Sequence, residues 1–161
     1  FLQIINSDIL ANVNNVGIFV STKVELSTDA IIEHLFISNV NIYIPQFSKG
    51  NPDMKMLHLT NDEWKRGLPT TLWGIRQHTI DTQAQELNEP LDLLFMPAVA
   101  FAVQDGKNIR LGHGKGYFDK FLAQHKNTYN KLPLLVGLAL REQMVISLPT
   151  ESHDVPVDIV L

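Results

Sequence analysis

Cysteine is absent from this chain of 161 residues, which excludes both a disulfide framework and a cysteine-ligated metal site. Long apolar runs are absent too: none approaches the roughly 20 residues that a membrane-spanning helix needs. We therefore expect no membrane partner. A chain without cysteine is compatible with a reducing compartment, and we expect a cytoplasmic location. A mitochondrial one stays open, because the N-terminal residues carry no informative leader.

Charged residues are scarce at 19%, below the usual quarter, and the formal net charge of -4 argues against a nucleic-acid partner. The charge is uneven. Residues 105–131 carry six basic and two acidic side chains, a net +4, which leaves -8 for the remainder. A local positive field suits a small anionic ligand, although a solvated helix face explains Lys120, Lys126 and Lys131 equally well. With 45% hydrophobic residues, we expect one domain over residues 1–161, and a monomer.

Apolar patterning predicts strands that alternate with helices. The expected strands cover residues 16–21, 41–45, 54–59, 91–97 and 134–140, and the expected helices cover 1–10, 29–38, 61–66 and 117–126. Thr60 and Glu63 form a capping box before the third helix, and residues 67–90 read as a long irregular connection. This order predicts a three-layer α/β domain with a mainly parallel sheet, in which ligands bind beyond the carboxyl ends of the strands.

Three alternating glycines, Gly112, Gly114 and Gly116, precede the expected helix over residues 117–126. Without Cβ atoms the backbone can turn sharply, and its N–H groups at a helix start can approach an anion. Lys115 can reach a phosphate as a point charge, and Arg110 can clamp one with two hydrogen bonds. The pattern is neither a P-loop nor a dinucleotide fingerprint. It therefore predicts an anion loop at a strand-to-helix junction, with a tight packing turn as the alternative.

Two carboxylates are candidate magnesium ligands. Asp119 lies in the first turn of the expected helix, where it either compensates the helix dipole or coordinates Mg²⁺ beside phosphates. Asp154, in the loop over residues 151–155, is the possible second ligand, with an ordinary loop acid as the alternative. The six histidines have no zinc spacing, and no serine has a G-x-S-x-G context.

The segments Leu91-Asp-Leu-Leu-Phe-Met-Pro97 and Arg110-Leu-Gly-His-Gly-Lys-Gly-Tyr-Phe-Asp119 closely resemble the 5-formyltetrahydrofolate cyclo-ligase family. The family pattern is Met-Pro-Gly, then Phe-Asp, then Arg-Leu-Gly-x-Gly-x-Gly-Tyr-Tyr-Asp. The strand over residues 17–21 with Glu25, the run Leu68-Pro-Thr-Thr-Leu-Trp-Gly74 and residues 139–143 match further landmarks. The resemblance extends from residue 16 to residue 161.

The resemblance implies Mg-ATP-dependent cyclisation of 5-formyltetrahydrofolate to 5,10-methenyltetrahydrofolate, with ATP and Mg²⁺ as cofactors. It implies that Asp119 and Asp154 hold Mg²⁺ and that Lys115, Arg110 and Tyr117 act in catalysis. The implied ATP-binding residues are Arg110, Leu111, Gly112, His113, Gly114, Lys115, Gly116, Tyr117 and Phe118. The implied folate-binding residues are Val20, Glu25, Trp73, His113, Gly114, Lys115, Gly116 and Tyr117.

The chain departs from the family pattern at a few positions. Ala98 stands where the family has Gly, Ala102 where it has Asp, and Phe118 where it has the second Tyr. No counterpart of the family's N-terminal basic helix is visible, because Lys23 is the first basic residue. We therefore expect this chain to fold but to catalyse poorly. A non-catalytic nucleotide- or folate-binding, or RNA-associated, paralogue is the alternative function. A sugar-phosphate isomerase-like domain fits less well, because it explains neither Glu25 nor Asp119.

Overall fold

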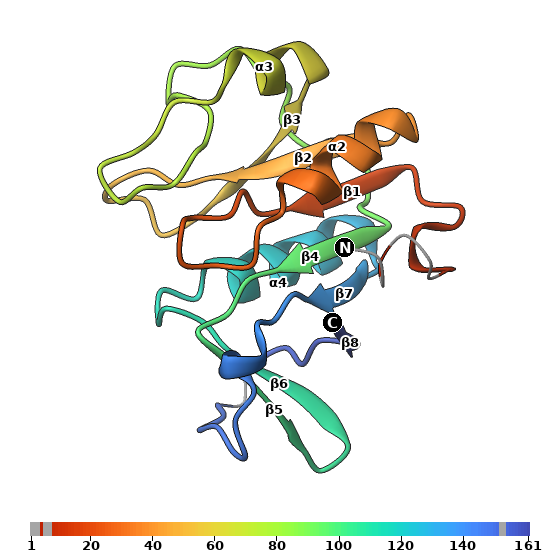
Figure 1. Ribbon diagram of the computed structural model, residues 1–161, viewed down its shortest axis with the longest axis vertical. Coiled ribbons are helices and arrows are strands. Elements are labelled where there is room, and N and C mark those ends of the chain that lie inside the picture. The colour runs from red at the N-terminus through yellow and green to blue at the C-terminus, as the bar shows by residue number, and fades with distance from the viewer. Residues whose placement is uncertain (1–3, 5–7, 152–153) are drawn as a thin grey trace.

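A six-stranded mixed sheet forms the centre of the computed structural model, which describes residues 4, 8–151 and 154–161 (Figure 1). The strands are β1 (Asn15–Ile18), β2 (Asn41–Gln46), β3 (Lys55–Leu59), β4 (Leu93–Met96), β7 (Leu134–Gly137) and β8 (Ile159–Val160). They lie in the order β3-β2-β1-β4-β7-β8. Only the β2–β3 pair is antiparallel among these neighbours, so the expected mainly parallel sheet is confirmed.

Helices cover both faces of the sheet. Helix α2 (Asp29–Ile37) lies in front of it in Figure 1, and α4 (Tyr117–Tyr129) lies behind it. Side chains that alternate along each strand divide between the two faces: Leu93 and Phe95 of β4 pack on the α2 side, and Leu94 and Met96 pack on the α4 side. All four residues of β4 are buried, as expected of a central parallel strand. The predicted three-layer α/β architecture is therefore observed.

Most predicted elements occur with shifted ends. Helix α3 (Asn61–Arg66) begins at its predicted capping box, in which the Thr60 hydroxyl accepts a hydrogen bond from the peptide N–H of Glu63. Helix α4 ends three residues later than predicted, and β4 and β7 are shorter than predicted. The predicted N-terminal helix falls mostly outside the described residues. Ile4 is helical, and a 3-10 turn, η1, covers Asp8–Leu10. A second 3-10 turn, η2, covers Arg141–Gln143.

The sequence reading missed an antiparallel hairpin. Strands β5 (Ala100–Gln104) and β6 (Lys107–Leu111) pair with each other outside the main sheet, at the bottom of Figure 1. Asp105 and Gly106 join them with positive φ angles of 49° and 74°. An Asp-Gly pair between two extended segments is a common hairpin signal, which the strand and helix assignments from the sequence left unused. Arg110 therefore belongs to a strand, whereas the sequence placed it in a glycine-rich loop.

The long connection over residues 67–90 is irregular, as predicted, apart from isolated bridges such as Thr70 with Arg76. In the described part of the chain, no helix combines the length and apolar character needed to cross a membrane.

Candidate active site

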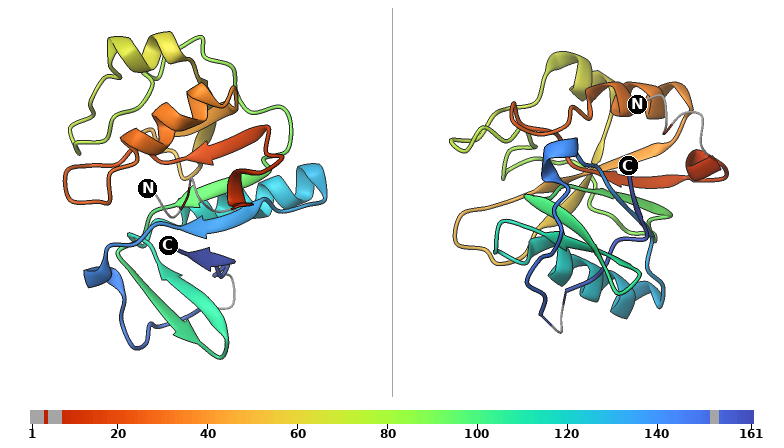
Figure 2. Two further views of the ribbon diagram at one scale, coloured as in Figure 1. Left: turned by 45° about the vertical axis from the view of Figure 1, so that its right-hand side comes forward. Right: turned by 60° about the horizontal axis from the view of Figure 1, so that its bottom comes forward.

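The carboxyl ends of β1, β2 and β4 lie at one edge of the sheet, on the left in Figure 1. The chain leaves β1 toward β2 on one side, and β4 lies on the other side of β1. This reversal is a topological switch point, where open α/β sheets bind their ligands. The loops that follow these strands, residues 19–28, 47–54 and 97–99, all lie at this edge, and so does the glycine segment before α4 (Figures 1 and 2).

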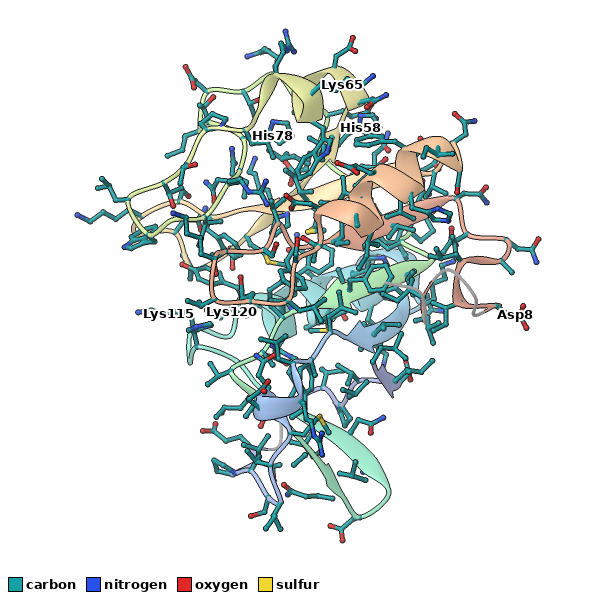
Figure 3. All side chains as sticks on the ribbon, viewed as in Figure 1. Asp8, His58, Lys65, His78, Lys115 and Lys120 are labelled. Atoms are coloured by element: carbon teal, nitrogen blue, oxygen red, sulfur yellow. The ribbon has the colours of Figure 1, made fainter. Side chains whose placement is uncertain are left out.

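The glycine segment connects β6 to α4. Gly114 and Gly116 have positive φ angles of 74° and 65°, and Gly116 is the N-cap of α4. Leu111 and Gly112 are partly exposed, and the next three residues are exposed, with Lys115 at the left-hand edge in Figure 3. The first backbone hydrogen bond of α4 runs from the N–H of Lys120 to the carbonyl of Gly116 at 3.0 Å. Among the described residues, the N–H groups of residues 112–119 donate to no other protein group.

Arg110 is turned into the protein beneath this segment. Its side chain is 6% exposed, and its Nη2 atom donates to Oδ2 of Asp119 at 3.0 Å, while Nη1 donates to the carbonyl of Pro97 at 3.3 Å. The guanidinium also lies 5.6 Å from the ring centroid of Phe118, which is buried. Burial lowers the pKa of Arg110, and the nearby carboxylates of Asp119 and Asp154 oppose that shift. We expected this side chain to be open to a phosphate, but it is buried and paired with Asp119.

Asp119 links three segments of the chain. Its Oδ1 atom accepts a hydrogen bond from the peptide N–H of Val155 at 3.3 Å, and its Oδ2 atom binds Arg110 of β6. Asp154 follows in the same C-terminal loop, and its Oδ2 atom accepts from the N–H of Glu151 at 2.8 Å. The structure thus brings the segments of Asp119 and Asp154 together beside Arg110. No group of three or more possible metal ligands occurs within residues 4, 8–151 and 154–161.

Tyr117 connects the glycine segment to the β2–β3 loop. Its hydroxyl donates to the carbonyl of Asn51 at 3.3 Å, and its ring lies 5.0 Å from that of Phe47. The sequence reading missed Phe47 and Asn51. An aromatic residue directly after a buried strand was the available signal, since such positions face the ligand edge of a parallel sheet.

Glu25 lies in the β1–α2 loop. Its Oε2 atom accepts from both the N–H and the hydroxyl of Thr22, each at 2.8 Å, whereas its Oε1 atom has no partner within the described residues. The two ends of this loop are joined by reciprocal bonds: the Ser21 N–H donates to the Thr28 hydroxyl, and the Thr28 N–H donates to the Ser21 hydroxyl. Val20, which directly precedes Ser21, is buried at 4% exposure. The loop, closed at its ends by the Ser21–Thr28 bonds, therefore leaves the Oε1 atom of Glu25 available to a ligand.

Trp73 occupies a small hairpin that begins and ends at the bridged pair Thr70 and Arg76. Bonds of 2.8 Å from Thr71 N–H to the Ile75 carbonyl and of 2.9 Å from Gly74 N–H to the Thr71 carbonyl close it. Leu72 and Trp73 stand at the tip, and Trp73 is 61% exposed. Because the Trp73 indole is exposed, one of its faces is free to stack on a flat aromatic ring.

The comparisons with known proteins agree on one family. The sequence model of the 5-formyltetrahydrofolate cyclo-ligase family matches residues 1–161. A 5-formyltetrahydrofolate cyclo-ligase of Haemophilus influenzae is 39% identical, over 88% of this chain and 72% of its own. One of Mus musculus is 35% identical, over 93% of this chain and 73% of its own.

The solved structures agree with these relatives on the fold. The 5,10-methenyltetrahydrofolate synthetase of Aquifex aeolicus superposes with a TM-score of 0.69 at 23% identity, over 98% of this chain and 74% of that one. The alternative of a non-catalytic paralogue gains no support from these names. The match over the whole chain and the named relatives together show that this chain belongs to the 5-formyltetrahydrofolate cyclo-ligase family of enzymes.

Proposed function

We propose that the protein uses Mg-ATP to close 5-formyltetrahydrofolate into 5,10-methenyltetrahydrofolate. The observation that carries the proposal is the run of unpartnered N–H groups over residues 112–119, next to the exposed Lys115 at the switch-point edge of the sheet. A polyphosphate accepts several such donors at once, and the N-terminus of α4 adds a favourable dipole.

Within the proposal, ATP occupies the glycine segment and the folate lies between this segment and Glu25. The free Oε1 atom of Glu25 can accept from the amino-pyrimidine edge of a pterin. The exposed indole of Trp73 offers that ring a stacking surface. Tyr117 fixes the start of α4 against the β2–β3 loop and so orients the N–H groups that face the phosphates.

The proposed reaction has two steps. The formyl oxygen attacks the γ-phosphorus, ADP leaves, and an iminium that carries the phosphate forms. The N10 atom then attacks the formyl carbon and loses its proton, and inorganic phosphate leaves with the former formyl oxygen. Because no protein nucleophile is needed, the chain contributes positioning and charge neutralisation. Lys115 and the loop N–H groups suit the charge that develops on the phosphates.

The carboxylates fit a magnesium ion that keeps several waters and phosphate oxygens. Asp119 and Asp154 come from adjoining segments, and each oxygen of Asp119 keeps a lone pair beyond its one protein donor. A bound Mg²⁺ would neutralise phosphate charge. Arg110 holds Asp119 in place from below, so we assign it a positioning role in preference to direct phosphate contact.

The direct test follows the absorbance of the methenyl product with 5-formyltetrahydrofolate, ATP and Mg²⁺ present together, and with each omitted in turn. The proposal expects product only in the complete mixture, with ADP formed in equal amount. Folate binding without any turnover would favour the non-catalytic alternative. Product without ATP would contradict the proposed reaction.

A further inference from the structure

The guanidinium of Arg76 contacts three separate segments near the switch-point edge. Its Nη1 and Nη2 atoms donate to the two carboxylate oxygens of Asp29, at 3.2 Å and 2.5 Å. Nη2 also donates to the carbonyl of Ser21 at 3.4 Å, and the guanidinium lies 5.2 Å from the ring centroid of Trp64 in α3. A two-pronged arginine–carboxylate pair fixes orientation as well as distance, which a single contact does not.

These contacts join the two segments that carry the proposed folate residues. Arg76 ends the hairpin whose tip holds Trp73. Ser21 begins the loop that carries Glu25, and Asp29 follows the residue, Thr28, that closes this loop. In Figure 2 both segments lie at the same end of the sheet, away from the β5–β6 hairpin. The tip of the hairpin and the Glu25 loop therefore share one anchor.

Other contacts tie the base of the hairpin to the end of β2, and none of these bonds reaches the Glu25 loop. Gln77 pairs with the backbone of Phe47, and Gln46 donates to the carbonyl of Thr79. Gln77 and Thr79 lie after the hairpin, and the Gln77 N–H also donates to the carbonyl of Pro69 at 3.0 Å, so these bonds fix the base of the hairpin beside the end of β2. Among the described residues, Arg76 alone of residues 70–76 has a side-chain bond to the β1–α2 region.

We infer that Arg76 is a positioning residue for the folate: its bonds to Asp29 and Ser21 hold the Trp73 hairpin at a fixed distance from Glu25. The inference rests on the proposed function: the anchoring bonds of Arg76 help to set the affinity for the pterin ring. When Arg76 is removed, the hairpin keeps its own internal bonds but loses its anchor to the β1–α2 loop. The Trp73 indole then samples many positions. Binding of the pterin ring must therefore pay the conformational entropy of fixing the indole, which weakens folate affinity.

The test compares Arg76→Ala, Arg76→Lys and Asp29→Asn with the parent protein. The expected result for Arg76→Ala is a KM for 5-formyltetrahydrofolate raised about tenfold, the size expected for lost hydrogen bonds to a charged group, with an unchanged KM for ATP. Arg76→Lys keeps one charged contact and should recover part of the loss. Lys131→Ala removes a partly exposed ion pair with Asp92, 3.6 Å long, just before β7 and β4 and so at the opposite edge of the sheet, and serves as the matched control.

A role limited to stability would lower the melting temperature and leave both KM values unchanged, and that result would overturn the inference. An equal rise in the KM values for folate and ATP would overturn it as well. Wild-type protein that neither binds nor converts 5-formyltetrahydrofolate would instead contradict the proposed function. The two failures are distinguishable, because the first leaves the parent protein active.

Discussion

The Nε2 atom of His125 accepts a hydrogen bond from the peptide N–H of Leu91 at 3.0 Å, and its Nδ1 atom lies 2.9 Å from the carbonyl of Lys131. A carbonyl only accepts, so Nδ1 carries the proton and Nε2 is the acceptor. This arrangement fixes the neutral ring and ties the end of α4 to the residues before β4. The ring is buried, with His125 only 2% exposed.

We predict that this histidine makes folding stability depend on pH. Burial lowers the pKa of His125 below its ordinary value of 6.5, so the unfolded chain takes up the proton at a higher pH than the folded protein does. Its contribution is therefore fully present above pH 6.5 and is lost as the pH falls below that value. The check is the urea midpoint between pH 8 and pH 5, for the parent and for His125→Gln. The difference between them should shrink toward acid, and a constant difference would contradict the prediction.

Replacement of Lys115 should weaken the binding of ATP. The side chain is exposed between two glycines at the start of α4, where none of the described residues forms an ion pair with it. Lys115→Ala loses a charged hydrogen bond of about 1.5–3 kcal/mol, roughly tenfold or more in nucleotide affinity or turnover. Titration calorimetry with ATP measures the loss. Lys107→Ala, in the β5–β6 hairpin, is the control for net charge. Equal affinity and turnover in Lys115→Ala and the parent would exclude the phosphate role.

Replacement of Glu25 should weaken the binding of folate and leave the binding of ATP unchanged. Glu25→Gln keeps the shape and an acceptor for Thr22 but removes the charge that faces a pterin edge. We expect the KM for 5-formyltetrahydrofolate to rise, while the KM for ATP stays within error. The reverse pattern would mean that this carboxylate belongs to the nucleotide site.

Loss of Arg110 should destabilise the fold strongly. Its removal leaves the Asp119 carboxylate, 16% exposed, without its cation, and breaking such a pair costs about 3–5 kcal/mol. Chemical denaturation of Arg110→Met should show this loss. The double variant with Asp119→Asn removes both charges and should recover part of the stability. Full stability in Arg110→Met alone would show that the pair contributes nothing.

A side chain at Gly137 should be poorly tolerated. A Cβ atom there would lie 2.4 Å from Cε1 and 2.7 Å from Cζ of Phe101, whose ring is completely buried. Gly137→Ala should therefore cost about 1–3 kcal/mol by overpacking. Gly106→Ala, in open space in the hairpin turn but at a φ angle of 74°, separates backbone strain from crowding. If Phe101→Leu restores stability to Gly137→Ala, the crowding explanation is correct. If it does not, that explanation fails.

The sequence alone determined the elements whose signals are local. Nearly continuous apolar residues over 91–97 indicated the central strand, and the capping box of Thr60 and Glu63 located α3. The glycine segment with its flanking residues identified the family, since that spacing is a property of consecutive positions. These features depend on neighbours within a few residues, where backbone geometry limits the alternatives.

Only the tertiary structure decided how distant side chains pair. Arg110 appeared to be a phosphate clamp because its sequence neighbours are glycines, but the β5–β6 hairpin turns it inward onto Asp119. Arg76 and Asp29 are 47 positions apart, and no local pattern predicts their contact. Such pairings depend on the strand order and on which face each side chain takes. A change of one residue in register reverses that face, so the completed sheet determines which charges meet.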